Sequence, residues 1–257
     1  MYRLILPYLF FMIPAVHADG LNDTGIGFCV DGSANTADCA TVSGDGGAYP
    51  RQDARYGRDA AATAGQLTKS GGGANGFDFT PITNSGGILL TFSTIGYGSG
   101  DWACTLDNRT GLVWEVKTAD GGLRDQSWTY TWYDSSLNYG GSHGTPSGGT
   151  CMTAGRCDTE KYVADVNATA LCGHNNWRVP TLIELQGIVN YGRTDPAIDQ
   201  TYFPNTPQST FWTSSPVFNS GPVVKSSLWY VNFNNGFSNT GSFTDPRLLR
   251  LAARFKY

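Results

Sequence analysis

Apolar and polar residues alternate most clearly in residues 228–233, near the C-terminal end of the chain. Alternation places successive side chains of a strand on opposite faces of a sheet. The apolar row is Trp229, Val231 and Phe233, and the other row is Tyr230 and Asn232. Asn234, Asn235 and Gly236 follow as a strong turn signal. The pattern therefore predicts a strand with one buried face, ended by a tight turn.

Residues 248–256 show the same alternation. One face would carry Leu249, Leu251, Ala253 and Phe255, and the other would carry Arg250, Arg254 and Lys256. Shorter strands are predicted at 111–116, 129–133 and 211–214, where aromatic and β-branched residues gather.

Two segments between these strands have a helical period. Residues 160–171 place Tyr162, Val166 and Ala170 on one face, and Gly173 follows as a stop signal. A second helix begins after Pro180, where Thr181 and Glu184 form a T-x-x-E capping box ahead of the apolar stripe of Leu182, Leu185 and Val189. Two central helices flanked by antiparallel strands predict an α+β domain over residues 102–257.

The N-terminal part has a different organisation. Residues 1–18 combine Arg3, a short apolar run and small residues at a cleavage position, which is typical of a signal peptide. Residues 19–101 are rich in Gly and Asp and lack long apolar runs, so we expect an irregular extension. Residues 71–76 match G-x-G-x-x-G, but no apolar strand precedes them and they are interpreted as a loop.

Composition narrows the cellular context. Six cysteines in an exported chain predict three disulfides, and fifteen pairings are possible. Because short loops close most easily, the spacing favours Cys29–Cys39, Cys151–Cys157 and the remaining pair Cys104–Cys172. The net charge of −4 gives no reason to bind nucleic acid, and no segment after residue 18 has the length and apolarity of a transmembrane helix. We expect an extracytoplasmic protein in the periplasm, at the cell surface or outside the cell.

A set of ordered motifs then identifies a family. They are CTLDNRTGLVWE at 104–115, NWRVPTLIEL at 176–185, PAID at 196–199, YFPN at 202–205, FWTSS at 211–215 and WYVNFNNG at 229–236. In this order they resemble the C-terminal domain of the Legionella collagen-like adhesin. The segments LNDTG at 21–25 and QDARYGRD at 52–59 resemble an N-terminal extension of some members. The resemblance implies a C-type-lectin-like fold, related to that of the formylglycine-generating enzymes, and a glycan-binding role as a possible homo-oligomer.

Candidate chemistry in the chain favours binding over catalysis. His143 and His174 stand alone, no G-x-S-x-G or H-E-x-x-H motif occurs, and no cysteine follows Cys172, where the formylglycine-generating enzymes would have theirs. Glu184 is explained by its capping box, and Arg178 by a structural hydrogen bond. No metal site and no cofactor are predicted, although calcium is left open. Trp114, Trp177, Trp212 and Trp229 are expected in the core.

These observations predict a secreted or cell-surface ligand-binding module, such as a glycan-binding adhesin. A structural or partner-binding subunit of an envelope or extracellular assembly is the alternative, and an enzyme ranks last. The expected partner is a glycan or an extracellular protein. Candidate ligand-binding residues are Tyr230, Asn232, Asn234 and Asn235 on the strand and turn, because tyrosine and amide groups suit sugars. A rival site for sulfates is the basic row Arg250, Arg254 and Lys256.

Overall fold

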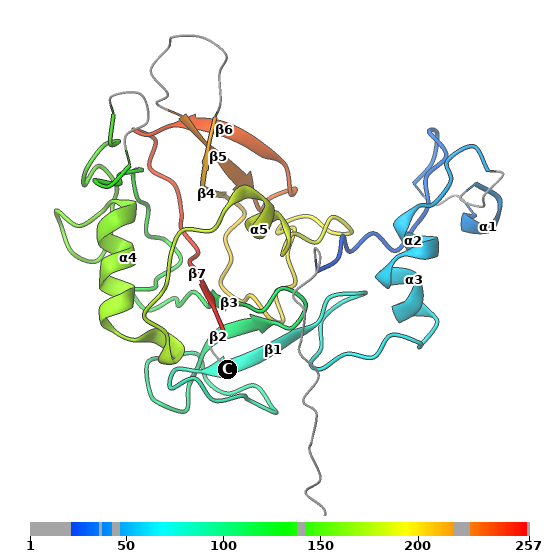
Figure 1. The fold of residues 1–257 in the computed structure, drawn as a ribbon, viewed down its shortest axis with the longest axis horizontal. Coiled ribbons are helices and arrows are strands. Elements are labelled where there is room, and N and C mark those ends of the chain that lie inside the picture. The colour runs from blue at the N-terminus through cyan, green and yellow to red at the C-terminus, as the bar shows by residue number, and fades with distance from the viewer. Residues whose placement is uncertain (1–21, 36–37, 43–46, 138–141, 218–226, 256–257) are drawn as a thin grey trace, which may run out of the picture.

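The computed structural model describes residues 22–35, 38–42, 47–137, 142–217 and 227–255 (Figure 1). The predicted signal peptide and Lys256 lie outside these residues. Within the described ranges, no helix is long and apolar enough to cross a membrane.

The first sheet has four antiparallel strands in the order β1-β2-β3-β7. They are β1 (Phe79–Thr83), β2 (Trp102–Asp107), β3 (Leu112–Glu115) and β7 (Ala252–Arg254). The turn between β2 and β3 follows from its sequence, because the Asp107 carboxylate accepts hydrogen bonds from the backbone N–H groups of Arg109 and Thr110. Gly111 then adopts a φ of 66°, which glycine adopts without strain.

The second sheet has the order β4-β5-β6 and is also antiparallel. Its strands are β4 (Thr210–Pro216), β5 (Ser227–Asn232) and β6 (Ser238–Ser242). The prediction that Trp229 is buried is wrong, since it is half-buried while Leu228 is fully buried. The reason is that both faces of β5 pack on protein: Leu228 joins one hydrophobic cluster and Val231 the other. Trp114, Trp177 and Trp212 are buried as predicted.

The two central helices are shorter than predicted. Helix α4 spans Thr159–Ala168, and a 3₁₀ turn, η1 (Leu171–Gly173), follows after Ala170 adopts a left-handed conformation. Helix α5 spans Leu182–Gln186 and begins with the predicted capping box: Thr181 Oγ1 accepts from Glu184 N, and the Glu184 side chain accepts from Thr181 N. Figure 1 shows α4 at one side of the body and α5 beside the second sheet.

Residues 129–133 do not form the predicted strand. They make isolated bridges to four different segments, namely at Thr150, Arg247, Asp158 and Gly144. Because no single neighbour runs alongside for more than one residue, a ladder cannot propagate. The segment instead joins several parts of the core, where Tyr130 and Trp132 are buried.

The C-terminal segment also differs from its prediction, because 248–256 is not one alternating strand. Its first part bridges Phe211 of β4, its middle bridges Arg178, and only Ala252–Arg254 pair with β3 as β7. Protein covers both sides of this segment, so every residue from 249 to 253 is buried. The strict alternation of an inner and an outer face is therefore wrong here.

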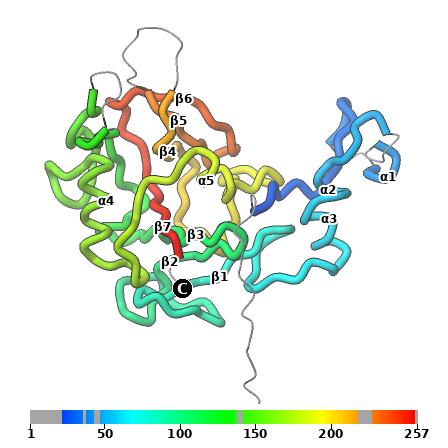
Figure 2. Tube along the Cα trace, viewed as in Figure 1, coloured from blue at the N-terminus to red at the C-terminus, as the bar shows by residue number. Residues whose placement is uncertain are grey.

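In the described part of residues 19–101, the N-terminal extension holds three short helices and one strand. The helices are α1 (Cys39–Val42), α2 (Asp53–Tyr56) and α3 (Arg58–Thr63), and they project from one side of the body, away from α4 (Figures 1 and 2). The strand β1 pairs with β2, so the predicted boundary at residue 102 divides the first sheet. The disulfides are Cys29–Cys39, Cys104–Cys172 and Cys151–Cys157, the pairing that loop spacing predicts.

Candidate functional site

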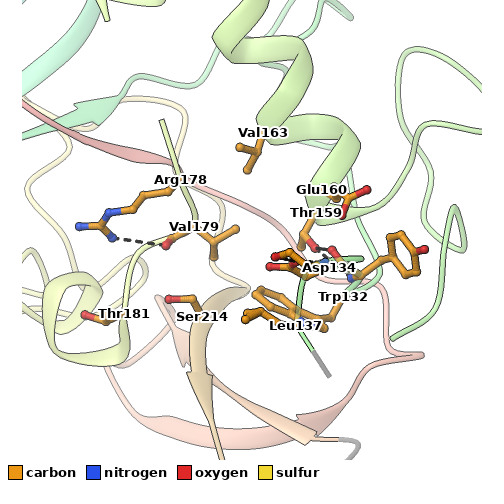
Figure 3. Close-up of a pocket in the computed structure, with 12 residues that line it drawn as sticks. Trp132, Asp134, Leu137, Thr159, Glu160, Val163, Arg178, Val179, Thr181 and Ser214 are labelled. Carbon is orange, nitrogen blue, oxygen red and sulfur yellow. Dashed lines mark hydrogen bonds between the residues drawn. The ribbon is translucent and has the colours of Figure 1, made fainter. Parts of the chain in front are cut away.

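An open cleft of about 530 Å³ lies between the start of α4, the segment before α5 and the end of β4 (Figure 3). It is lined by Trp132, Tyr133, Asp134, Ser136, Leu137, Thr159, Glu160, Val163, Arg178, Val179, Thr181 and Ser214. A volume of this size accommodates a small organic ligand such as one or two sugar rings.

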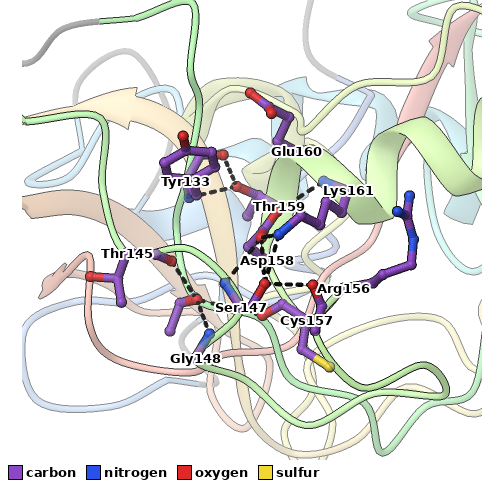
Figure 4. A network of polar contacts seen from close by, with 12 residues as sticks. Tyr133, Thr145, Ser147, Gly148, Arg156, Cys157, Asp158, Thr159, Glu160 and Lys161 are labelled. Carbon is purple, nitrogen blue, oxygen red and sulfur yellow. Dashed lines mark hydrogen bonds and ion pairs between the residues drawn. The ribbon is translucent and has the colours of Figure 1, made fainter.

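One wall of the cleft is built around the first turn of α4. Asp158 is the N-cap, and its buried carboxylate accepts from the backbone N–H of Lys161 at 2.9 Å. The adjacent Thr159 hydroxyl donates to the carbonyl of Tyr133, and Thr159 Oγ1 accepts from the backbone N–H of Tyr133 at 2.9 Å (Figure 4). This reciprocal pair fixes Tyr133 and Thr159, which both line the cleft, relative to each other.

The same Asp158 carboxylate also holds the preceding loop. It accepts from the backbone N–H of Ser147 at 3.0 Å and from the ammonium of Lys161 at 2.9 Å (Figure 4). The Cys151–Cys157 disulfide closes the loop just before this N-cap. One buried carboxylate therefore caps α4, pairs with Lys161 of the same helix and ties the loop at Ser147 to it, which makes this wall rigid.

The opposite wall is the extended segment from Arg178 to Thr181. Both guanidinium Nη atoms of Arg178 bind the two carboxylate oxygens of Glu184, at 2.8 and 2.6 Å. The hydrogen bond to Glu184 raises the pKa of Arg178. Burial opposes ionisation of Glu184, but hydrogen bonds from Arg178 and Thr181 hold its pKa below the usual value. The sequence-based interpretation of Arg178 as a structural donor agrees with this bidentate pair.

The inner surface of the cleft is mainly apolar, with charge at its rim. Trp132, Val163 and Val179 form the apolar part, and Asp134 and Glu160 bring carboxylates to the edge (Figure 3). Because Glu184 already neutralises Arg178, the side chains that line the cleft leave an excess of negative charge. Such a surface can cover an apolar ligand face and accept hydrogen bonds from hydroxyl or ammonium groups.

The strand residues predicted to bind a ligand do not line this cleft. The ring of Tyr230 lies under the guanidinium of Arg247, 3.8 Å from its centroid. The amide oxygens of Asn232 and Asn235 accept from the backbone N–H groups of Asn234 and Phe237 and so hold the turn. Of these residues, only Asn234 is exposed, and the others are half-buried. A ligand at Tyr230, Asn232, Asn234 and Asn235 stays a prediction.

The predicted basic row requires a correction. Arg250 is fully buried, and its guanidinium donates to the carbonyl of Glu115 and to the hydroxyl of Thr206. Burial lowers the pKa of Arg250 to about 10. Arg254 is exposed, and Lys256 lies outside the described residues. Arg250 cannot meet a ligand at the surface because the segment that carries it crosses the interior.

Sequence reasoning also missed which side chains line the cleft. The sequence predicts a strand at 129–133 and gives no sign that the exposed residues 135–137 after it border a cleft. A local signal existed, because Asp158 and Thr159 before a helical pattern mark an N-cap. The remaining walls come together only through tertiary contacts.

Comparison with known proteins identified one relationship. A family model described as the Lcl C-terminal domain matches residues 103–253. No curated protein and no solved structure matched the chain.

Proposed function

Since this chain belongs to the Lcl C-terminal domain family, we propose that it is a secreted or cell-surface module that binds a ligand in the cleft between α4, α5 and β4. The disulfides and the adhesin-associated family point to an extracytoplasmic location. The proposal includes a C-type-lectin-like fold and a binding role without catalysis.

The observation that carries this proposal is the combination of an apolar inner surface with a polar rim in one rigid cleft. Sugars offer apolar ring faces and many hydroxyl groups, and an aromatic and carboxylate surface complements both. Asp134 and Glu160 disfavour sulfated or carboxylated sugars by like-charge repulsion. The ligand class is therefore a neutral or amino-bearing carbohydrate.

A glycan array with purified protein tests the proposal. We expect binding to neutral sugars that changes little between low and high salt, and binding to amino sugars that weakens as salt rises, since salt screens charge-led contacts. Exclusive binding to sulfated glycans, lost at high ionic strength, would contradict the proposed ligand class.

Variants of the cleft then test its position. Leu137→Ala and Asp134→Ala remove exposed or half-buried side chains at the rim. Both should weaken binding to the best array ligand at least several-fold, as expected for loss of an apolar contact or a hydrogen bond to a charged group. Asn234→Ala, at the exposed turn, is the matched control and should bind as the wild type does. The reverse result would place the ligand at the β5 strand and turn instead.

A protein-binding role is the second candidate, favoured by exposed apolar side chains after β1. Ile88, Leu90 and Phe92 are 59%, 96% and 47% exposed. Contiguous exposed apolar surface is typical of protein contacts. Under this candidate, Leu90→Ser abolishes concentration-dependent self-association in analytical ultracentrifugation, while sugar binding is unchanged. If the wild-type chain stays monomeric at all concentrations, these apolar side chains do not bind a second copy of the chain.

A further inference from the structure

Residues 22–70 of the N-terminal extension have almost no apolar interior. Among its described residues, the buried side chains are those of Asn22, Cys29 and Asp59. Helices α1 and α2 bury no residue, and α3 buries Asp59 alone. Helices of four to six residues are not stable through their own backbone hydrogen bonds. The extension therefore needs another source of order besides the Cys29–Cys39 disulfide.

Three carboxylates converge where the parts of this extension meet. One oxygen each from Asp23, Asp53 of α2 and Asp59 of α3 lies within 4.8 Å of the others. These residues come from separate positions, before the disulfide loop and in two successive helices. A single bound group at their centre would connect all three segments.

Hydrogen bonds satisfy only part of this group. Asp59 Oδ1 accepts from the backbone N–H of Gly76 at 2.9 Å, and Asp53 Oδ2 accepts from the hydroxyl of Thr24. The other oxygen of Asp59 is buried without a hydrogen-bond partner, although the residue is only 1% exposed. Asp23 Oδ2 is likewise buried and unpartnered. Carboxylate oxygens without a partner are costly inside a protein, so either a proton or a cation has to lie between Asp23 and Asp59.

No side chain among the described residues supplies that partner as an ion pair. Arg58 lies in the same region, but its Nε donates to the carbonyl of Gly76 and it forms no ion pair with the three carboxylates. Burial and the side-chain hydrogen bond to Asp59 raise the pKa of Asp23 to about 8. The two carboxyl groups are therefore not both ionised unless a cation lies between them.

We propose that Asp23, Asp53 and Asp59 bind a calcium ion that holds the N-terminal extension together. The three oxygens lie within 4.8 Å of one another, close enough for one cation to contact all of them. Three carboxylates suit calcium, which takes six to eight oxygen ligands in flexible geometry, better than magnesium, which usually keeps several waters and one or two carboxylates. Backbone carbonyls and water complete the shell. This assignment goes beyond the ligand cleft and does not depend on it.

Limited trypsin digestion of the full chain, after removal of metal with a chelator, tests this site. Trypsin can cut the extension after Arg51, Arg55, Arg58 and Lys69. Calcium should protect these bonds, with half-protection at about 10⁻⁴–10⁻³ M as in extracellular calcium modules. Isothermal titration with calcium chloride should give a matching affinity.

Asp59→Asn tests the assignment to these residues. Asparagine keeps the acceptor for Gly76 and removes one negative charge, so the extension should fold without metal while its calcium response is lost. Asp38→Asn is the matched control, because Asp38 is exposed, accepts from Ala40 and lies in the same extension. It should keep the wild-type response.

The main rival is a proton shared by Asp23 and Asp59. In that case wild-type digestion is the same with and without calcium, no binding heat appears, and Asp59→Asn is stabilised without any metal effect. Either that set of results or wild-type calcium affinity in Asp59→Asn overturns the proposal.

Discussion

Replacing Lys117 by methionine should strongly destabilise the domain, because Lys117 belongs to a charge network inside the core. Lys117 and Glu115 are 1% and 0% exposed. The ammonium lies 3.0 Å from Glu115 Oε1 and 3.1 Å from the Tyr162 hydroxyl. Tyr162 donates to the same carboxylate, and the backbone N–H of Leu251 donates to its other oxygen at 3.0 Å.

The size of the effect follows from what remains after the substitution. Lys117→Met removes the ion-pair partner of Glu115 and leaves it with two hydrogen-bond donors and the charge of Arg250 nearby. Breaking a buried ion pair costs about 3–5 kcal/mol. For a domain of this size, 1 kcal/mol corresponds to about 2–4 °C, so we expect the melting temperature to fall by about 6–20 °C. Replacing both partners, as in Glu115→Gln with Lys117→Met, should cost less than the sum of the single changes by about 2–3 kcal/mol.

Urea unfolding without reductant, followed by tryptophan fluorescence, measures these free energies. Arg156→Met is the matched control, because its partner Asp165 forms an ion pair in which both side chains are partly exposed. Such a pair contributes at most about 1 kcal/mol. If Lys117→Met is no more destabilising than Arg156→Met, or if the two core changes are additive, the network does not stabilise the domain as argued.

Three further predictions concern pH, the disulfide and the α4 cap. Burial raises the pKa of Asp107 to about 6, although hydrogen bonds from Thr110 and Arg109 oppose this shift. Between about pH 4 and 6 the native state therefore binds more protons than the unfolded chain. The free energy of unfolding should then fall by about 3 kcal/mol as pH rises through this window. Urea unfolding across this range should show a flatter profile for Asp107→Asn. Replacing both Cys104 and Cys172 by alanine removes the disulfide that closes a loop with a sequence separation of 68. In the loop-entropy model, this should lower the free energy of unfolding by about 4 kcal/mol, which thermal unfolding measures. Asp158→Ala should lower the free energy of unfolding by more than about 2 kcal/mol, because it removes the helix cap and the contacts to Ser147 and to the Lys161 ammonium. Asp158→Asn should retain most of the cap. Thermal melts followed by circular dichroism measure both effects.

Features decided by neighbouring residues were predictable from the sequence. The capping box at Thr181 and Glu184 depends on three residues of spacing, and its geometry is present. The turn at 234–236 and the two short disulfides also follow from local spacing, and Cys104–Cys172 is then the pair that remains. Local rules succeed here because both partners of each interaction are close in sequence.

Features decided by tertiary contacts were not predictable. Trp229 was expected in the core, but it is half-buried while its neighbour Leu228 is fully buried, because both faces of β5 are covered. Arg250 is buried, and its guanidinium donates hydrogen bonds to Glu115 and Thr206, residues separated from it by 135 and 44 positions. Alternation reports a buried face only when the other face meets water. The cleft, which is built from four distant segments, has no signature of its own in the sequence.

The burial of Arg250 also changes which ligand the charge distribution favours. A sulfate site on the C-terminal segment required several cations on one exposed face, and Arg254 is the one exposed member within the described residues. A single exposed arginine binds a sulfate weakly in salt, because its charge is screened over a distance of about 8–10 Å. The cleft, by contrast, combines an apolar inner surface with the carboxylates of Asp134 and Glu160. Its electrostatics repel anions and leave hydroxyl donors unaffected, so a ligand in the cleft should be recognised by its shape and its hydrogen bonds.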